Sequence, residues 1–85
     1  MRYTVTWLPH VEKRLTEIWL NEQDKKAIAT AANQIDQILH HDPDKKGVPF
    51  HGRRHLFVSP LAILFIVYPD DCRVEVVRVR KDIKS

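Results

Sequence analysis

The feature that most constrains the fold is an uninterrupted apolar run, Leu61-Ala-Ile-Leu-Phe-Ile-Val-Tyr68. It is far shorter than the roughly 20 residues that span a bilayer, and it is bounded by Ser59-Pro60 and by Pro69-Asp-Asp71. Short apolar runs between turn signals are typical of strands at the centre of a sheet that are covered on both faces. The run therefore predicts a central strand and a sheet around it.

Two alternating segments predict strands that pair with this run. Residues 53–58 alternate between Arg54, Leu56 and Val58 on one face and Arg53, His55 and Phe57 on the other. Residues 73–81 also alternate, but the phase slips between Val76 and Val77, which indicates either a bulge or a middle covered on both faces. In both cases Arg78 and Arg80 point the same way.

The first half of the chain predicts one strand followed by two helices. Residues 2–7 alternate and are rich in β-branched and aromatic side chains, which predicts a short strand. Apolar residues recur at helical spacing from Pro9 to about Leu20, and again from Asp24, a suitable N-cap, to about His40. Because the polar link between them is short, the helices should lie roughly antiparallel. Residues 41–52 lack periodicity and predict a loop.

Length and composition fit one globular domain that spans residues 1–85, since 44% of the residues are hydrophobic and 29% are charged. The order β-α-α-β-β-β predicts an α+β fold, an antiparallel sheet with a helical hairpin packed on one face. The single Cys72 cannot close an intramolecular disulfide, and no signal-peptide or membrane-spanning pattern is present. We therefore expect a cytoplasmic protein without membrane contact.

The charge is unevenly distributed along the chain. Residues 1–44 carry 5 basic and 7 acidic side chains, whereas residues 45–85 carry 9 and 4, so net charges of −2 and +5 combine to the chain's +3. A basic half favours an anionic partner, such as nucleic acid or an acidic peptide, although the excess is small for a dedicated DNA-binding domain.

Six residues of the predicted C-terminal strands are candidates for a binding site: Arg53, Arg54, His55, Arg78, Arg80 and Lys81. Side chains of paired strands converge where they share a face, and Arg binds phosphate or carboxylate through two parallel hydrogen bonds. The alternative interpretation is a solvated sheet face. His55 is the candidate for proton transfer near neutral pH, and a hydrogen-bonded structural histidine is the alternative.

Other side chains favour structural roles. The five histidines lack a set of thiolates or carboxylates at metal-ligand spacing, so we expect no metal and no cofactor. Four aromatic residues fall on apolar faces and favour the core over base-stacking platforms: Trp7, Trp19, Phe57 and Phe65. The chain has no Gly-rich phosphate loop and no Ser/His/Asp spacing.

These segments together resemble the RelE/ParE family of bacterial toxins from type II toxin–antitoxin modules. The resemblance covers the whole chain: Tyr-Thr-Val-Thr-Trp at residues 3–7, Leu-Thr-Glu-Ile-Trp in the first helix, Ile-Asp-Gln-Ile-Leu in the second, Arg-Arg-His-Leu-Phe-Val-Ser-Pro-Leu-Ala-Ile-Leu-Phe-Ile-Val from residue 53, and Val-Glu-Val-Val-Arg-Val-Arg from residue 74. It implies a growth-inhibiting toxin, linked to plasmid stabilization and neutralised by a cognate antitoxin, in a hetero-oligomer with that partner or as a homodimer.

The resemblance leaves two kinds of target open. One branch of the family cleaves ribosome-bound mRNA, and the other inhibits DNA gyrase. The first typically uses an arginine on a central strand and a Tyr or His near the C-terminus, but the matching position here is Ala62, and residues 81–85 contain neither Tyr nor His.

RNA cleavage by the 2′-hydroxyl needs a base, an acid and a cation. Here Arg53, Arg54, Arg78 and Lys81 would supply charge, and His55 alone would move protons. We therefore predict a ParE-like gyrase inhibitor without catalysis, with a RelE-like ribosome-dependent endoribonuclease as the alternative.

Overall fold

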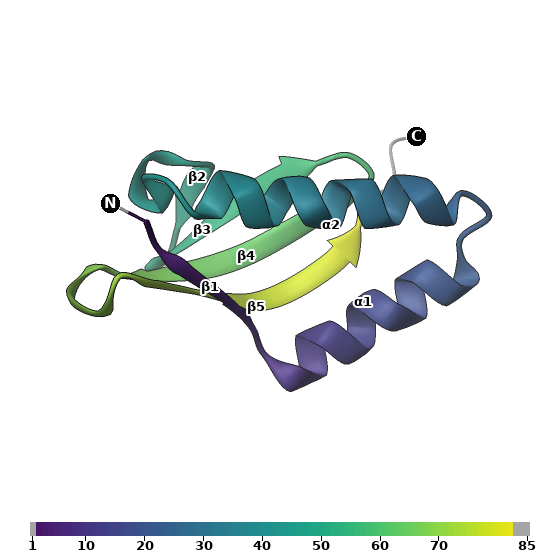
Figure 1. Ribbon diagram of the computed structural model, residues 1–85, viewed down its shortest axis with the longest axis horizontal. Coiled ribbons are helices and arrows are strands. Elements are labelled where there is room, and N and C mark those ends of the chain that lie inside the picture. Colours follow the sequence, from purple (N-terminus) through teal and green to yellow (C-terminus); the bar gives the residue numbers. More distant parts are fainter. Residues whose placement is uncertain (1, 83–85) are drawn as a thin grey trace.

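The computed structural model describes residues 2–82, in which a five-stranded sheet carries two helices (Figure 1). The elements are β1 (Thr4–Trp7), α1 (Pro9–Asn21), α2 (Lys25–Leu39), the short 3₁₀ turn η1 (Pro43–Lys45), β2 (Val48–Phe50), β3 (Arg53–Val58), β4 (Leu61–Tyr68), the turn η2 (Pro69–Asp71) and β5 (Arg73–Lys81). The strand order is β1-β5-β4-β3-β2, so the apolar run forms the central strand. The predicted α+β class is confirmed.

Local signals set the ends of both helices. Pro9 occupies the first turn of α1, where its missing N–H leaves no gap, and the Asp24 side chain caps α2 by accepting a hydrogen bond from the Ala27 N–H at 3.1 Å. The Lys25 ammonium closes the link between the helices, because it donates to three backbone carbonyls at the end of α1, those of Trp19, Leu20 and Glu22, at 3.0–3.1 Å. Within residues 2–82 neither helix is long and apolar enough to cross a bilayer.

One pairing corrects the predicted antiparallel sheet: β1 runs parallel to β5, with Thr4 opposite Arg73, while the other neighbours are antiparallel. The helical hairpin explains the difference. Since α2 runs back along α1, it returns the chain to the start of β1, where the Tyr3 N–H donates to the His40 carbonyl at 2.9 Å. The hairpins that follow alternate in direction, so that β3 and β5 both run the same way as β1.

Residues 41–52 are the second correction, because they contain η1 and β2 rather than a loop alone. β2 is only 3 residues long, contains Pro49 and is exposed along its length, so it leaves no hydrophobic period to detect. It joins β3 through a two-residue turn at His51 and Gly52, whose φ angles are 48° and 79°. A two-residue link that contains Gly was the available signal, since the favoured hairpin turns need positive φ.

The hydrophobic core lies between the helices and one face of the sheet (Figure 1). Its buried members come from both helices and from β4 and β5: Val11, Ile18, Ile28, Ala31, Ile35, Leu39, Leu61, Ile63, Phe65, Val74, Val76 and Val79. On the opposite face of β4, Ala62 and Leu64 are only 4% and 8% exposed. No helix of residues 2–82 covers that face, so the side chains of neighbouring strands cover the central strand there.

β5 contains the irregularity that its phase slip indicated. The residues of β5 paired with β4 jump from Val76 to Arg78, so Val77 is the extra residue of a β-bulge. The bulge lets Val76 and Val79 both reach the core while Arg78 and Arg80 stay exposed. In a regular strand of this sequence, both arginines would share the face of Val76 and enter the core.

Deletions at the bulge test this account. Deletion of Val77 alone restores a regular alternation with Val79 still inward, so we expect a folded protein whose melting temperature falls by only about 5 °C. Deletion of Val77 together with Arg78 turns Val79 outward and Arg80 inward. Burial of an unpaired guanidinium should then remove most of the roughly 5–15 kcal/mol that stabilises a domain. Thermal unfolding followed by circular dichroism measures the stability of both variants. Equal losses of stability would contradict the interpretation that the bulge determines which side chains of β5 face the core.

An ion pair between Lys81 and Glu22 ties the end of β5 to the end of α1. The hydrogen bond from the Lys81 ammonium lowers the pKa of Glu22 below its ordinary value of 4.5, against a smaller opposing effect of burial. The folded state therefore favours the charged carboxylate. The resulting stabilisation is present above the ordinary pKa and is lost as the pH falls through the lowered one.

We expect Lys81→Ala to raise the pKa of Glu22 towards its ordinary value, because the main donor to the carboxylate is removed. A pH titration of the side-chain carboxyl ¹³C signal measures this directly. Lys45→Ala, which removes a charge from the exposed turn η1, is the matched control and should leave Glu22 unchanged. If Glu22 titrates alike in the wild type and in the Lys81 variant, the pair does not exist in solution.

Candidate functional site

The sheet face away from the helices, which we call the open face, gathers basic and aromatic side chains. It is formed by alternate residues of β2, β3, β4 and β5: Phe50, Arg53, His55, Phe57, Ala62, Leu64, Arg78 and Arg80. The strand register sets them in rows: one consists of His55, Leu64 and Arg78, and the next of Phe57, Ala62 and Arg80. Each row runs from an aromatic ring over an apolar floor to an arginine.

A cavity of about 280 Å³ lies over this floor. Phe50 and His55 line one side of it, and Arg78 and Arg80 line the other. Ligand pockets typically measure roughly 300–1,000 Å³, so this hollow suits one side chain or one base rather than a larger ligand. Because both arginines are exposed, their guanidinium forks are available for phosphate or carboxylate oxygens.

His55 is held by two aromatic rings. The Phe50 ring stacks on it with centroids 5.1 Å apart and planes within 4° of each other, and the Phe57 ring meets it edge-on at 5.7 Å. The imidazole is half-buried. Contacts with Phe50 and Phe57 thus fix the orientation of the His55 ring over the cavity. A group that stacks on a base or transfers a proton needs such a fixed orientation.

Arg54 does not belong to the open face, which corrects its place among the candidate residues. Successive residues of a strand point to opposite faces, and Arg54 points to the side opposite its neighbours Arg53 and His55. Its Nε donates to the carbonyl of Lys46 at 2.5 Å, and its Nη2 donates to that of Gly47 at 3.2 Å. Arg54 therefore fastens the segment before β2 onto β3 and has a structural role.

Gly47 makes this attachment sterically feasible. Its φ is +70°, and a Cβ atom at this position would lie 2.0 Å from the carbonyl oxygen of His55. A side chain would push the segment away from β3. Gly47 and Arg54 together bring β2 close to β3, and this proximity places Phe50 over His55.

Lys81 is also absent from the open face. It pairs with Leu61, a core residue of β4, and its ammonium binds Glu22 at the end of α1. The phase after the bulge explains this position, since Lys81 follows Arg80 and must point to the helix side. Of the six candidates, the structure thus brings Arg53, His55, Arg78 and Arg80 together on one face and separates Arg54 and Lys81 from them.

The aromatic residues divide differently from the sequence interpretation. Phe65 is fully buried as expected, but Phe57 and Trp19 are 51% and 39% exposed, and Phe57 lies on the open face. Trp7 is half-buried and its indole N–H donates to Asp36 at 2.9 Å. Phe50 lies in the segment that the sequence predicted as a loop, so sequence reasoning did not place it on this face; the two-residue turn at His51 and Gly52 was the available signal.

The other histidines do not add chemistry to this face. Nδ1 of His40 contacts the Tyr3 carbonyl oxygen at 2.6 Å, which links the end of α2 to β1. His51 occupies the β2–β3 turn, where its ring meets Phe50 edge-on at 4.6 Å. No group of three His, Cys, Asp or Glu side chains suited to a metal ion occurs within residues 2–82.

Arg54→Ala should release the segment before β2 and with it Phe50. Loss of two charge-assisted hydrogen bonds is expected to lower the free energy of unfolding by about 2 kcal/mol and to shift the His55 ring protons downfield as the stacked Phe50 ring leaves. Denaturant unfolding and NMR measure the two effects. Lys26→Ala, at an exposed position outside the open face, is the control. A His55 spectrum unchanged by Arg54→Ala would show that Phe50 is held by other contacts.

Comparison with known proteins identifies the fold. No model of a protein family matches the sequence, and no curated protein matches it. Among solved structures, the RelBE2 toxin–antitoxin complex of Mycobacterium tuberculosis is similar with a TM-score of 0.74 and 15% identity, over 95% of this chain and 92% of that one. The archaeal RelE–RelB complex of Pyrococcus horikoshii has a TM-score of 0.70 and 14% identity over 100% of both chains.

The isolated RelE toxin of E. coli is similar as well, with a TM-score of 0.65 and 14% identity over 98% of this chain and 87% of that one. Identities this low leave individual residue roles undetermined, whereas the agreement extends over nearly the whole length of each chain. This chain has the α+β fold of the RelE toxins.

Proposed function

We propose that this protein is the cytoplasmic toxin of a type II toxin–antitoxin module and that it engages its target through the open face. The observation that carries the proposal is the pair of rows in which an aromatic ring, an apolar floor and an arginine follow one another across β3, β4 and β5. A hollow with cationic rims and stacking surfaces suits an anionic partner. The fold that presents it is that of RelE toxins.

A cognate antitoxin is the partner that this proposal requires. Two of the similar structures are complexes of a toxin with its antitoxin. In this chain the helical hairpin leaves apolar surface uncovered: Trp19 and Leu20 are 39% and 59% exposed, and a hollow of about 190 Å³ lies between α1 and α2. Exposed apolar surface of this kind supports a protein partner or a second copy of the chain.

Inhibition of DNA gyrase by binding is the action that we favour. The position at which the resemblance implies a catalytic arginine is Ala62, which is 4% exposed and forms part of the cavity floor. The methyl group offers neither a charge nor a proton. The open face therefore combines cationic contacts with a single imidazole, that of His55, over the cavity floor, and this set suits recognition better than acid–base catalysis.

Ribosome-dependent cleavage of mRNA is the second candidate, and the fixed position of His55 favours it. In such a reaction the 2′-hydroxyl attacks the adjacent phosphorus while a base takes its proton, an acid protonates the leaving 5′-oxygen, and cations stabilise the developing negative charge. His55 would serve as base or acid, and Arg78 and Arg80 would stabilise the charge. The remaining proton-transfer group would have to come from the ribosome.

Induced expression in bacteria tests the proposal. We compare the wild type with Arg78→Ala/Arg80→Ala and with Lys26→Ala/Lys45→Ala, a control that removes the same charge from exposed positions outside the open face. Growth arrest should require the two arginines and survive in the control. Because all four side chains are exposed, each substitution should change the free energy of unfolding by no more than about 0.5 kcal/mol.

The type of arrest identifies the target. Filamentous cells with a DNA-damage response, together with inhibition of supercoiling by purified protein, support gyrase. Immediate arrest of translation and cleavage of mRNA in a translation extract support the ribonuclease. In whichever assay responds, the purified Arg78→Ala/Arg80→Ala variant should require at least about tenfold more protein than the wild type for a half-maximal effect. Toxicity that persists undiminished in the arginine variant would exclude the open face as the target-binding surface.

A further inference from the structure

The open face continues past the cavity to the end of the sheet where β1 begins. In the registers of β5 with its two neighbours, Arg73 lies opposite Tyr68 of β4 and Thr4 of β1. Since Val74 and Val76 are buried beneath the helices, the odd-numbered residues of β5 before the bulge point to the open face. We call the residues at this end the polar extension: Thr4, Thr6, Tyr68, Arg73 and Glu75.

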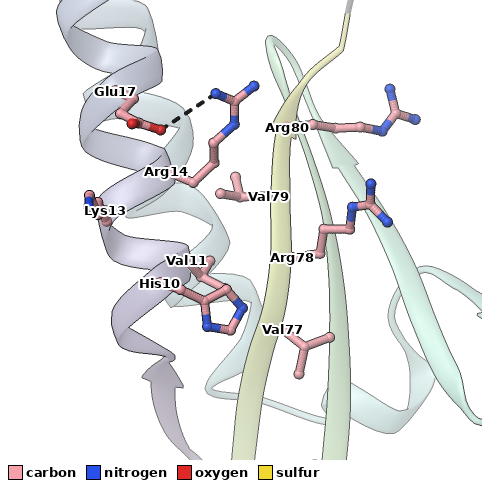
Figure 2. Close-up of a pocket in the computed structure, with 9 residues that line it drawn as sticks. All are labelled: His10, Val11, Lys13, Arg14, Glu17, Val77, Arg78, Val79 and Arg80. Atoms are coloured by element: carbon pink, nitrogen blue, oxygen red, sulfur yellow. Dashed lines mark ion pairs between the residues drawn. The ribbon is translucent and has the colours of Figure 1, made fainter.

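Two neighbours within the polar extension hold Arg73 in place. Its guanidinium lies over the Tyr68 ring, 4.3 Å from the centroid, and its Nη1 donates to Oε2 of Glu75 at 3.0 Å. The two charged side chains are 34% and 21% exposed, whereas those of the longer pair between Arg14 and Glu17 on α1 are more than half exposed (Figure 2). The Glu75 carboxylate thus neutralises an arginine that the Tyr68 ring keeps oriented, and water screens this pair less.

The charge along β5 therefore changes sign within one face of the sheet. Figure 2 shows Arg78 and Arg80 extending from β5 on the side away from α1, and both are exposed. Among the residues of 2–82 that the strand registers place on this face, Glu75 is the sole carboxylate. An anion over the two arginines is attracted, but its continuation towards β1 meets a negative charge beside an arginine that is already engaged.

We propose that Glu75 determines specificity, because it restricts the open face to a partner whose negative charge ends at Arg78 and Arg80 and is followed by a hydrogen-bond donor or a positive charge. A protein surface on which an acidic side chain adjoins a basic one fits this pattern. A nucleic-acid strand does not fit it, because phosphates repeat along its whole length. The inference rests on the proposal that the open face receives the target, and it assigns that target to the proteins.

Glu75→Gln keeps the size of the side chain and removes its charge. The probe is a fluorescent thymidine oligonucleotide of about ten nucleotides, within the roughly 4–16 that one small binding fold covers, and fluorescence anisotropy at low salt measures its affinity. The variant should bind the probe roughly three- to fivefold more tightly than the wild type, because Arg73 is released and a repulsion is lost. The plot of log affinity against log salt concentration should steepen by about 0.7, the value for one further phosphate contact on a single strand.

Two further variants show whether Arg73 provides that contact. Glu17→Gln is the matched control, since it removes the same charge from the exposed pair on α1, and it should leave the salt dependence unchanged. Arg73→Ala/Glu75→Gln should restore the salt dependence of the wild type. A salt dependence that Glu75→Gln leaves unchanged, or that Glu17→Gln steepens equally, would overturn the proposal.

Growth arrest provides the second readout. Glu75→Gln should weaken arrest although it strengthens oligonucleotide binding, whereas a purely structural role of Glu75 would weaken both. Stronger arrest together with tighter oligonucleotide binding would contradict a protein target and identify a polyanion instead. Arrest that survives in Arg78→Ala/Arg80→Ala would refute the proposed function, while the salt dependence measured for Glu75→Gln decides the role of Glu75 without reference to arrest.

Discussion

The β-bulge at Val77 is the constraint on which both surfaces of the sheet depend. Before it, the buried members of β5 occur at even positions, and after it at odd ones. The same residue therefore completes the core beneath the helices and turns Arg78 and Arg80 to the open face. A strand that must bury valines along its whole length and also present two arginines two residues apart cannot do so with a constant period of two.

A second set of contacts determines how well the open face is organised. Gly47 allows the segment before β2 to approach β3, and Arg54 holds it there from the opposite side of the sheet. The stacked rings of Phe50 and His55 follow from that approach. Arg54, whose side chain does not line the cavity, thus helps to position the cavity wall formed by Phe50. Gly47 contributes to the same wall because the absence of a side chain allows the close approach to β3. Such indirect support lets a small sheet hold aromatic groups in place without a second layer.

Sequence reasoning succeeded where the pattern within one segment carries the information. The apolar run predicted the central strand, and the phase slip at Val76 and Val77 marked the position of the irregularity, leaving a bulge and a doubly covered middle as alternatives. It failed where the deciding contact lies between distant segments. The direction of β1 depends on where the helical hairpin returns the chain, β2 is too short and too exposed to show a period, and the partners of Arg54 and Lys81 lie on other elements. Alternation alone already separated Arg54 from Arg53, so its grouping with the open face rested on residue type.

The parallel pairing of β1 with β5 also determines when the sheet can form during synthesis and folding. It joins Thr4 to Arg73, so the sheet cannot close until the last strand has been synthesised, and pairs so distant in sequence form slowly because a long loop must first be ordered. That last strand is also the one that carries Arg78 and Arg80. A nascent chain without β5 has nine of the twelve buried core residues but neither arginine over the floor of the open face. The complete open face, with its aromatic rings on one side and its two arginines on the other, therefore forms only after β5 has been added.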